Sequence, residues 1–337
     1  DGDGRMDHRT VFIDNVLLPR TVLPLKDRVL VNFTNTNAIW AYFDEDGDGV
    51  ADRRELAYEG DDNRGNNEHQ SSGLVWTLDN RIDNNYARFR WDDGRLIPTP
   101  HSVGRISQWG LARDDDGRLF CTWAGGANPA HSFQFPAGYP IIRINEHAEG
   151  FEIPHASCKV WDQSSGWYDE EKQRVLTKFS ACCGQTVIRS PLMPQWHGNV
   201  VACEPVGRLI RMSRIEWENG KGTAHNAFPD SEFIRSTDAY FRPVWTENGP
   251  DGCLYIADMY RQVIEGARFI PPDIRKKLYE QGKFSSGDDR GRIWRIRSKN
   301  ASPAFTRPSL SQAPIAQLAA LLEHSNGWYR MTAQRLL

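Results

Sequence analysis

A turn followed by a β-rich segment recurs along the chain, and this repeat constrains the fold more than any other feature. Its copies read KDRVLVNF (26–33), DNRIDNNYARF (79–89), DDGRLFCTW (115–123), HGNVVACEPVGRLIRM (197–212) and PDGCLYIADMY (250–260). The copies start about 35 to 80 residues apart, which brackets the ~40–50-residue period of a propeller blade if the longest gap holds an inserted loop. A β-sandwich is the alternative, but sandwiches do not repeat such a phrase. The repeat therefore predicts an all-β chain that forms a β-propeller, with about five blades visible.

The composition changes after residue 298. The segment GRIWRIRS (291–298) has the pattern of a closing strand, and the next residues are rich in Pro and Ser. Two runs with apolar residues at helical spacing follow, and neither is long enough to be stable alone. We therefore expect the propeller at 1–298, a linker at 299–311 and the start of a helical repeat domain at 312–337.

An acidic loop, DEDGDGVADRRE at 44–55, has an oxygen donor at every position that a twelve-residue calcium loop requires. The donors are Asp44, Asp46, Asp48, the carbonyl of Val50, Asp52 and Glu55. Gly49 stands at the sharp turn, and so many carboxylates in one loop would repel each other without a cation. A solvated acidic turn is the alternative, although it would need neither this glycine nor the closing acid. The pattern predicts a calcium ion with a structural role.

The chain opens within a second, partial copy of this loop. Asp1, Asp3, Gly4 and Asp7 match the full loop at an offset of 45 residues, while Thr10 replaces the closing acid. We expect Asp1, Asp3 and Asp7 to be further calcium ligands. We also expect residue 1 not to be a natural N-terminus, and the chain to be a piece of a longer protein.

The composition narrows the classes of partner. The net charge is −3, and no basic run is present that would collect phosphates, which argues against a nucleic-acid partner. No apolar run approaches the ~18 residues of a membrane span, so we expect none in this chain. A small or neutral substrate suits this balance.

Six cysteines stand at 121, 158, 182, 183, 203 and 253. They form no CxxC pair and no CxxCH motif, which argues against zinc and against covalent haem in this chain. The adjacent Cys182 and Cys183 can form a vicinal disulfide. Ordinary pairings, such as Cys158 with Cys182 or Cys203 with Cys253, are alternatives that the sequence does not separate. With the calcium loops, the cysteines favour an exported protein, periplasmic or extracellular and associated with the cell envelope.

The segment RGNNEHQSSGLVW (64–76) places a histidine in a polar loop directly before an apolar strand. In a propeller, such a loop lies over the central tunnel. A neutral imidazole accepts a proton near pH 7, so His69 is a candidate general base that Glu68 or an Asn would orient. A hydrogen-bonded surface histidine is the alternative interpretation.

Two further segments, 104–120 and 236–266, put arginines and aromatic residues at the entrances and ends of strands. They supply Arg105, Gln108, Trp109, Arg242, Tyr260 and Arg261. Guanidinium groups bind carboxylates bidentately and an indole ring stacks on a flat ring, so these residues suit a polycarboxylate ligand. Salt bridges between blades are the alternative. No GxSxG, P-loop or GxGxxG motif is present, so serine hydrolase, NTPase and nicotinamide functions have no support.

The phrases NNEHQSSGLVWTLDN, QWGLARDDDGRLF, FRPVWTENGPDGCLYIADMYRQVIEG and DDRGRIWRI occur in this order. Together with the two calcium loops they resemble the membrane-bound dehydrogenase propellers of large exported bacterial proteins. In that family the propeller precedes HEAT-type repeats and a c-type cytochrome domain. The propeller itself is similar to soluble glucose and sorbosone dehydrogenases, which use pyrroloquinoline quinone (PQQ). The resemblance spans residues 1 to 298, and 312–337 matches the start of the helical repeats.

This resemblance implies a propeller that is six-bladed in the intact parent protein and incomplete here. It also implies an enzyme that oxidises a sugar or alcohol, with calcium and PQQ as cofactors. By the same resemblance, His69 takes the hydroxyl proton as hydride passes to the quinone, and Arg105 and Gln108 lie near the quinone. Electrons then pass to a c-type cytochrome domain, in cis or in trans.

Two other functions stay open at the level of the sequence. One is a calcium-stabilised propeller without catalytic activity that binds glycans or proteins. The other is a lactonase-type hydrolase in which a tunnel Ca²⁺ polarises a carbonyl group, with Asn66, Glu68 and Glu204 as candidate ligands.

Overall fold

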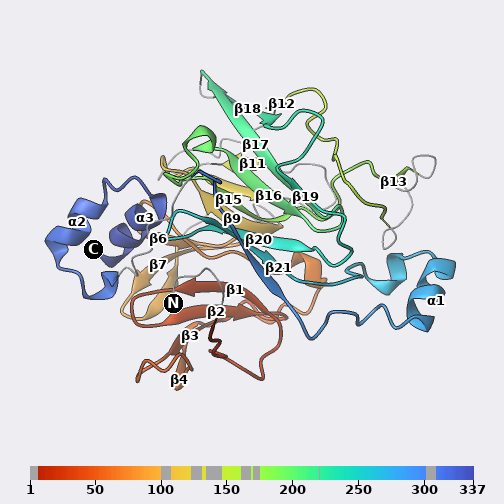
Figure 1. Ribbon diagram of the computed structural model, residues 1–337. Coiled ribbons are helices and arrows are strands. Elements are labelled where there is room, and N and C mark those ends of the chain that lie inside the picture. Colours follow the sequence, from red (N-terminus) through yellow and green to blue (C-terminus); the bar gives the residue numbers. More distant parts are fainter. Residues whose placement is uncertain are drawn as a thin grey trace. The chain divides into compact units, whose positions relative to one another are not determined.

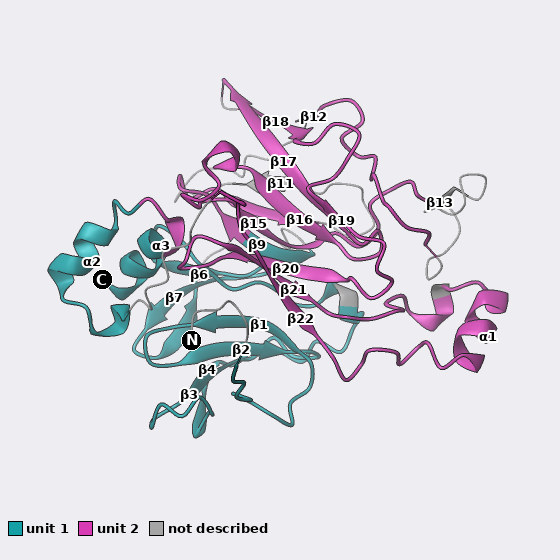
Figure 2. Ribbon diagram, viewed as in Figure 1, with its two compact units in different colours: residues 1–111, 304–324, 329–337 teal, residues 112–303, 325–328 magenta. Residues whose placement is uncertain are grey.

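A computed structural model describes residues 7–99, 108–122, 131–133, 146–160, 168–169, 175–219, 221–300 and 309–337. Within these ranges the chain is mostly β (Figure 1), and clustering of its contacts divides it into two compact units (Figure 2). Unit 1 comprises 1–111, 304–324 and 329–337, and unit 2 comprises 112–303 and 325–328. The predictions for Asp1, Asp3 and Arg105 fall outside the described residues.

Unit 1 contains two four-stranded antiparallel meanders, which is the strand order of a propeller blade. The first consists of β1 (Pro19–Pro24), β2 (Val29–Phe33), β3 (Ile39–Phe43) and β4 (Arg53–Tyr58), and the second of β5 (Val75–Trp76), β6 (Arg81–Asp83), β7 (Arg88–Asp92) and β8 (Arg95–Pro98). Asp93 and Gly94 both have positive φ (43° and 82°), the conformation of a type I′ hairpin turn, and they join β7 to β8.

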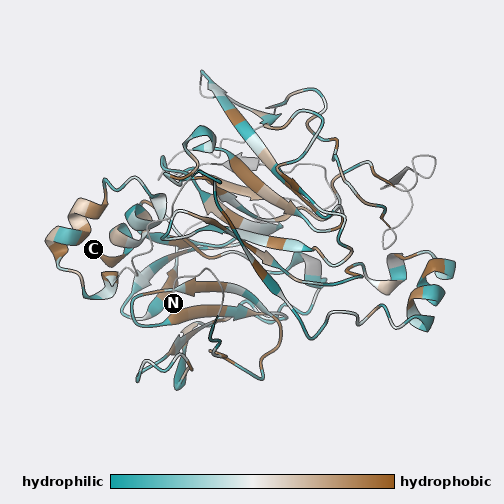
Figure 3. Ribbon diagram, in the orientation of Figure 1, coloured by the Kyte–Doolittle hydropathy of each residue, from teal (hydrophilic) through white to brown (hydrophobic). Residues whose placement is uncertain are grey.

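The core of unit 1 is made by residues from both meanders. Leu30 and Ile39 of the first pack in one cluster with Ile82 and Phe89 of the second, and each is at most 1% exposed. Alternate residues of a strand face opposite sides of its sheet, so these apolar positions form the buried face. Figure 3 shows the apolar residues along the strands.

Unit 2 contains a six-stranded sheet and several smaller ones. The six-stranded sheet has the order β12 (Glu146–His147), β18 (Lys221–Asn226), β17 (Leu209–Glu218), β16 (Val200–Glu204) and β15 (Cys183–Val187), with β19 (Ile234–Arg235) paired to β17. The smaller sheets are β20 (Pro243–Asn248) with β21 (Leu254–Asp258) and β22 (Arg292–Ile296), and the pair β13 (Tyr168–Asp169) with β14 (Val175–Leu176). A three-stranded sheet consists of β9 (Trp109–Arg113), whose first three residues belong to unit 1, β10 (Leu119–Thr122) and β11 (His131–Phe133).

Close packing of two sheets explains one glycine of unit 2. Val201, Ile210 and Ile256 belong to one buried cluster between β15–β18 and β20–β22. A Cβ atom on Gly184 would lie 2.2 Å from the carbonyl oxygen of Val244, so the backbones meet where no side chain fits.

The helices are short. The three α-helices of the described residues are α1 (Pro272–Glu280), α2 (Ile315–Leu321) and α3 (Gly327–Leu336), and single 3₁₀ turns are η1 (Asn67–His69), η2 (Pro194–Trp196), η3 (Ala267–Phe269) and η4 (Leu310–Gln312). Gln334 of α3 donates through Nε2 to the carbonyl oxygen of Thr77 (3.1 Å) and to Oδ1 of Asn80 (2.7 Å), the turn between β5 and β6. In the described part of the chain, every helix is too short or too polar to cross a bilayer.

The prediction of a mostly β, propeller-like chain is confirmed. Each of the five recurring phrases contains a strand, and four sheets have blade-like antiparallel order: β1–β4, β5–β8, β15–β18 and β20–β22. The closing strand at 291–298 is β22, and helices form within 312–337. Six blades, the HEAT-type repeat and the boundaries at 298 and 312 stay predictions.

Candidate functional site

The His69 loop, defined as residues 66–73, starts with the 3₁₀ turn η1 and is held by a buried glutamine. Gln70 is 1% exposed, and its Nε2 donates to Oδ1 of Asn35 (3.0 Å) and Oδ1 of Asn67 (3.1 Å). Its Oε1 accepts a hydrogen bond from the main-chain N–H of Asn35 (2.6 Å). The imidazole of His69 is exposed, and the side chain of Glu68 lies outside the described atoms. The loop therefore presents His69 from an anchored backbone.

A buried polar network joins this loop to the start of β9. The amide of Asn85 accepts from the N–H of Ser72 (2.7 Å) and donates to the carbonyl oxygen of Gln108 (3.2 Å), and Ser72 Oγ donates to that same oxygen (3.1 Å). Gly73 has a φ of +71°, and a Cβ there would lie 3.0 Å from the Gly110 backbone. The structure thus brings the His69 loop together with Gln108 and Trp109, which the sequence placed in separate phrases.

Arg20 of β1 completes this site, and sequence analysis did not identify it. Its Nε donates to the carbonyl oxygen of Ser71 (2.9 Å), its Nη1 donates to that of Asn67 (2.9 Å), and its guanidinium lies 5.1 Å from the ring centroid of Trp109. Nη2 is buried and has no hydrogen-bond partner in the described part of the chain. Burial lowers the pKa of Arg20 below its usual value. The segment PRTVLP gave no signal, because only the tertiary contacts set Arg20 beside the loop.

The arrangement combines three chemical groups in unit 1. Arg20 offers an unsatisfied N–H of a cation, Trp109 offers an aromatic face, and His69 offers an exposed imidazole. A buried donor without a partner costs free energy, and an oxygen of a bound carboxylate or carbonyl group would satisfy it. The site can therefore hold an oxygen-bearing ligand beside a group that exchanges protons near neutral pH.

The predicted arginines of unit 2 donate to main-chain carbonyls. Arg242 is fully buried, with Nη1 donating to the carbonyl oxygen of Pro205 (2.9 Å) and Nε to that of Arg261 (2.9 Å). Nη1 of Arg261 in turn donates to the carbonyl oxygen of Met259 (3.0 Å). These contacts tie loops together through main-chain carbonyl oxygens. The role of Arg242 and Arg261 as cofactor ligands stays a prediction.

Tyr260 lies in the same part of unit 2 with a positive φ of 55°. Its ring stacks on Tyr240 at 4.8 Å between centroids, and the guanidinium of Arg292 covers it at 4.4 Å. Arg292 also donates to Oδ2 of Asp258 (2.8 Å). The aromatic face of Tyr260 is therefore occupied by protein groups in this structure, and its part in cofactor binding is likewise still a prediction.

The acidic loop connects β3 to β4, and its first three aspartates converge. One carboxylate oxygen from each of Asp44, Asp46 and Asp48 lies within 4.8 Å of the others. Asp44 accepts hydrogen bonds from the N–H groups of Gly47 (2.7 Å) and Gly49 (3.0 Å), two glycines with positive φ. This donor set fits a hard cation such as Ca²⁺.

Asp52 and Glu55, two further predicted ligands of this loop, have protein partners in the structure. Asp52 accepts the main-chain N–H of Glu45 (2.7 Å), and the N–H of Val50 donates to Asp48 (2.7 Å). Glu55 lies on β4, where it pairs with Arg53 at 2.5 Å. Glu55, the closing acid of the loop, is thus paired with the guanidinium of Arg53 in this structure.

Thr10, the last position of the partial loop, and Phe12, which follows that loop, lie against the full loop. The N–H of Ala51 donates to the carbonyl oxygen of Phe12 (2.9 Å), and Gly49 lies beside Thr10. Asp7 is exposed in the described part of this segment. The last position of the partial copy therefore neighbours the full loop, and a ligand role for Asp7 stays a prediction.

Glu204, a candidate metal ligand, is fully buried in unit 2. It accepts the N–H groups of Ser180 (3.0 Å), Ala181 (2.9 Å) and Val206 (3.2 Å). Burial raises the pKa of Glu204, and the main-chain donors oppose this rise. The other candidate, Asn66, lies in unit 1, where its carbonyl oxygen accepts the N–H of His69 (2.9 Å).

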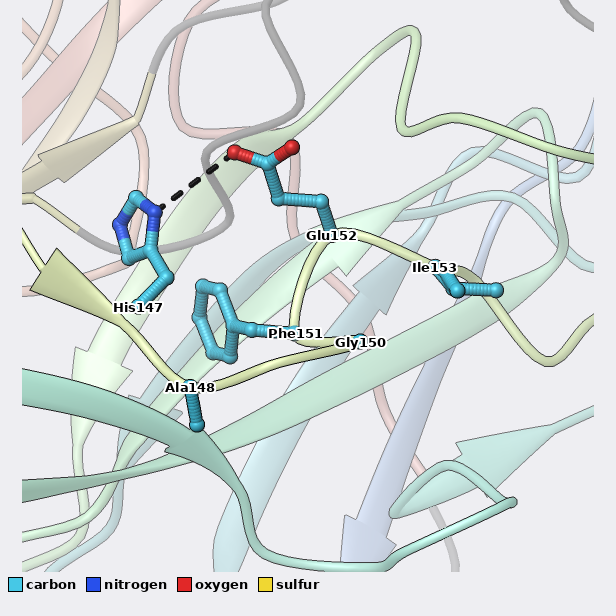
Figure 4. A pocket seen from close by; sticks show the side chains of 6 residues that line it. All are labelled: His147, Ala148, Gly150, Phe151, Glu152 and Ile153. Atoms are coloured by element: carbon cyan, nitrogen blue, oxygen red, sulfur yellow. Dashed lines mark ion pairs between the residues drawn. The ribbon is translucent and has the colours of Figure 1, made fainter.

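A pocket of about 390 Å³ in unit 2 is lined by none of the predicted residues. Its walls are His147, Ala148, Gly150, Phe151, Glu152 and Ile153 (Figure 4). The imidazole of His147 stacks on Phe151 at 4.9 Å, and its Nδ1 lies 3.6 Å from Glu152. Burial lowers the pKa of His147, and the neighbouring Glu152 opposes this shift.

Several solved structures resemble the chain. A luciferin-regenerating enzyme aligns with 86% of this chain and 80% of its own at 11% identity and a TM-score of 0.45. A glucose dehydrogenase aligns with 74% of this chain and 95% of its own at 11% identity and a TM-score of 0.36. Virginiamycin B lyase from Staphylococcus aureus aligns with 72% of this chain and 78% of its own at 14% identity and a TM-score of 0.37.

No curated protein matches the sequence. A family profile does match it, and the match extends over residues 1–300, which is most of the chain. The chain therefore belongs to the family described as Domain of unknown function (DUF7133).

Proposed function

We propose that the chain is a quinoprotein-like dehydrogenase that oxidises a sugar or alcohol at the His69 loop. The observation that carries this proposal is Arg20. Two of its nitrogens hold the His69 loop, while Nη2 is buried without a partner in the described part of the chain. An oxygen-rich planar cofactor such as PQQ would supply the missing acceptor, and Trp109 would stack on its rings.

The residues of the loop divide the remaining tasks. His69 accepts the proton of the substrate hydroxyl at its imidazole, because an exposed neutral imidazole is a good base near pH 7. Gln70 keeps the loop in place, so that the imidazole meets the substrate without further ordering. Bound PQQ would supply the oxidising power, since no side chain accepts hydride. Glu68 would orient His69, and Arg105 and Gln108 would complete the cofactor contacts.

The remaining parts of the proposal rest on the sequence. We propose that the protein is exported to the periplasm or the cell surface and that its electrons pass to a c-type cytochrome domain. Arg242, Tyr260 and Arg261 enter this proposal only as the resemblance implies them, because their contacts in the structure are with other groups of the protein. The proposed site rests on unit 1 alone.

We further propose that Asp44, Asp46 and Asp48 hold a structural Ca²⁺. Their converging oxygens support three of the positions that such an ion needs. Glu55 would reach the ion only by leaving Arg53, its present partner. The ion would then tie β3 to β4 and have no part in the chemistry.

The test is a titration of the calcium-loaded protein with PQQ, followed by absorbance during addition of sugars and alcohols. We expect saturable binding, a loss of affinity of at least about tenfold in Arg20→Ala, and bleaching that His69→Ala abolishes while it still binds the cofactor. Arg214→Ala is the matched control, because that side chain is 58% exposed. Absence of PQQ binding to the folded, calcium-loaded protein would overturn the proposal.

That negative outcome would leave a calcium-stabilised propeller that binds glycans or proteins. Calcium-dependent hydrolysis of a lactone would distinguish a lactonase from the dehydrogenase and from the binding propeller. Glu204 would have to exchange main-chain donors for the ion in that case, since its oxygens accept the N–H groups of Ser180 and Ala181.

A further inference from the structure

Two cysteines lie directly opposite each other in the six-stranded sheet of unit 2. β15 pairs antiparallel with β16, and the register sets Cys183 opposite Cys203, next to a bulge or irregularity between Cys183 and Gln185. Residues that are directly opposite in an antiparallel pair have their side chains on the same face. Cys203 belongs to a buried cluster with Ile188 and Ile210, and Cys183 packs against that cluster.

The spacing of this pair suits a disulfide. Directly opposite residues of antiparallel strands have Cα atoms about 4.5 or 5.5 Å apart, depending on whether they exchange hydrogen bonds. Both values fall inside the range of about 4.4–6.8 Å that disulfides adopt. Sγ of Cys183 lies 3.9 Å from the carbonyl oxygen of Cys203, so the sulfur already reaches the opposite strand.

The neighbouring cysteine faces the other side of the sheet. Cys182 packs with Phe179 and Leu209 in a different cluster, and its Sγ lies 3.7 Å from Oε2 of Glu204. Cys182 immediately precedes β15, and it lies in a different cluster from the one against which Cys183 packs. The fold thus favours a partner across the strands over the vicinal partner.

All six cysteines are thiols in the structure. We propose that Cys183 and Cys203 form a cross-strand disulfide when the chain folds in the presence of a small-molecule or protein disulfide oxidant. The Cys183 thiolate attacks one sulfur of the oxidant, whose S–S bond breaks and releases a thiolate. The Cys203 thiolate then attacks Cys183 in the mixed disulfide and releases the second thiol of the oxidant. The two cysteines are oxidised, the oxidant is reduced, and their two protons pass to its thiolates.

Burial sets when this bond can form. Cys203 is fully buried, and burial raises the pKa of both thiols, so the folded protein offers almost no thiolate. The two cysteines are therefore oxidised during folding, before other strands cover β16. The same burial then protects the finished bond from reductants.

The experiment compares two preparations of the full chain, one folded in a bacterial periplasm and one refolded with reduced thiols. Each is denatured in N-ethylmaleimide and digested with trypsin without reduction. Trypsin cleaves after Lys178, Arg189 and Arg208, so the bond would join peptide 179–189 to peptide 190–208. We expect the joined peptides only from the oxidised preparation, with a Tm about 5–10 °C above that of the reduced one.

Neighbouring variants locate the bond within peptide 179–189, which contains both Cys182 and Cys183. Cys182→Ser should keep the joined peptides, and Cys183→Ser should lose them. Cys253→Ser should also keep them, because it stands outside the pair. The proposal is overturned if a cooperatively folded, oxidised protein carries N-ethylmaleimide on Cys203, or if Cys203 is joined to Cys182 or Cys253.

Discussion

Arg20 donates from Nη1 to the carbonyl oxygen of Asn67 over 2.9 Å, two residues before His69 on the same 3₁₀ turn. The contact links strand β1 to a loop that lies 47 positions further along the chain. A single guanidinium thereby fixes the backbone that carries the candidate base. Its remaining nitrogen, Nη2, is buried without a hydrogen-bond partner in the described part of the chain, and an oxygen of a ligand would accept its hydrogen bond. The structural role of Arg20 is thereby linked to its proposed functional role.

Replacing Arg20 with Lys should loosen the His69 loop. Lysine keeps the charge but cannot donate to Ser71 and Asn67 in the same fork geometry, so we expect a loss of about 1–3 kcal/mol in unfolding free energy. Amide hydrogen exchange should rise in residues 66–73. Arg214→Lys, at a side chain 58% exposed, should change stability by less than about 0.5 kcal/mol. Unchanged exchange in the loop would contradict the anchoring role.

Asp83 should make stability depend on pH. It is fully buried, neither carboxylate oxygen accepts a hydrogen bond within the described part of the chain, and burial raises its pKa to about 7. The folded state thus holds this proton more tightly than the unfolded state. Its stabilisation is complete below pH ~3.8 and is lost as pH rises through about 7.

We therefore expect Asp83→Asn to be more stable than the parent above pH 7, by about 2–4 kcal/mol, and to show a flatter pH profile. Urea unfolding at pH 5 and pH 8 measures the difference. Asp92→Asn, whose side chain is 51% exposed, serves as the control and should follow the parent. Parallel profiles for Asp83→Asn and the parent would show that Asp83 titrates normally.

Calcium should stabilise unit 1 through the acidic loop. Asp48→Ala removes one of the three converging carboxylates, so the melting temperature should fall in calcium and no longer respond to a chelator. At a calcium concentration 100 times the Kd, the stabilisation lost is about 2.7 kcal/mol. Asp61→Ala, an exposed aspartate outside the loop, should keep the full response. A parent protein that melts identically with and without chelator would refute the site.

Unit 2 should depend on one buried ion pair. Arg211 and Glu232 are both fully buried, and Nε and Nη2 of Arg211 each donate to a different carboxylate oxygen of Glu232 at 2.7 Å. Glu232→Gln leaves a buried cation without its counter-charge, which should cost about 3–5 kcal/mol in urea unfolding. The control is Glu216→Gln, because that side chain is 53% exposed. Equal losses of unfolding free energy in the two variants would mean that the buried pair contributes no more to stability than the exposed one.

The sequence by itself determined the local structure. Alternating apolar residues specified the strands, Asp93 and Gly94 specified a tight hairpin, and the order of acids and glycines in 44–55 specified a loop in which Asp44, Asp46 and Asp48 converge. Each of these features depends on residues a few positions apart, where backbone geometry and side-chain periodicity decide the outcome. The propeller-like class followed from the repetition of one such phrase.

Tertiary structure alone decided which polar residues share a site. Arg20 reaches the backbone of the distant His69 loop at Asn67, while Arg242, an equally plausible ligand in sequence, is buried and donates to the carbonyl oxygen of Pro205. The opposition of Cys183 and Cys203 likewise depends on strand register. Long-range packing decides which acceptor each buried donor finds. Composition and spacing could therefore identify candidate residues but could not assign their roles.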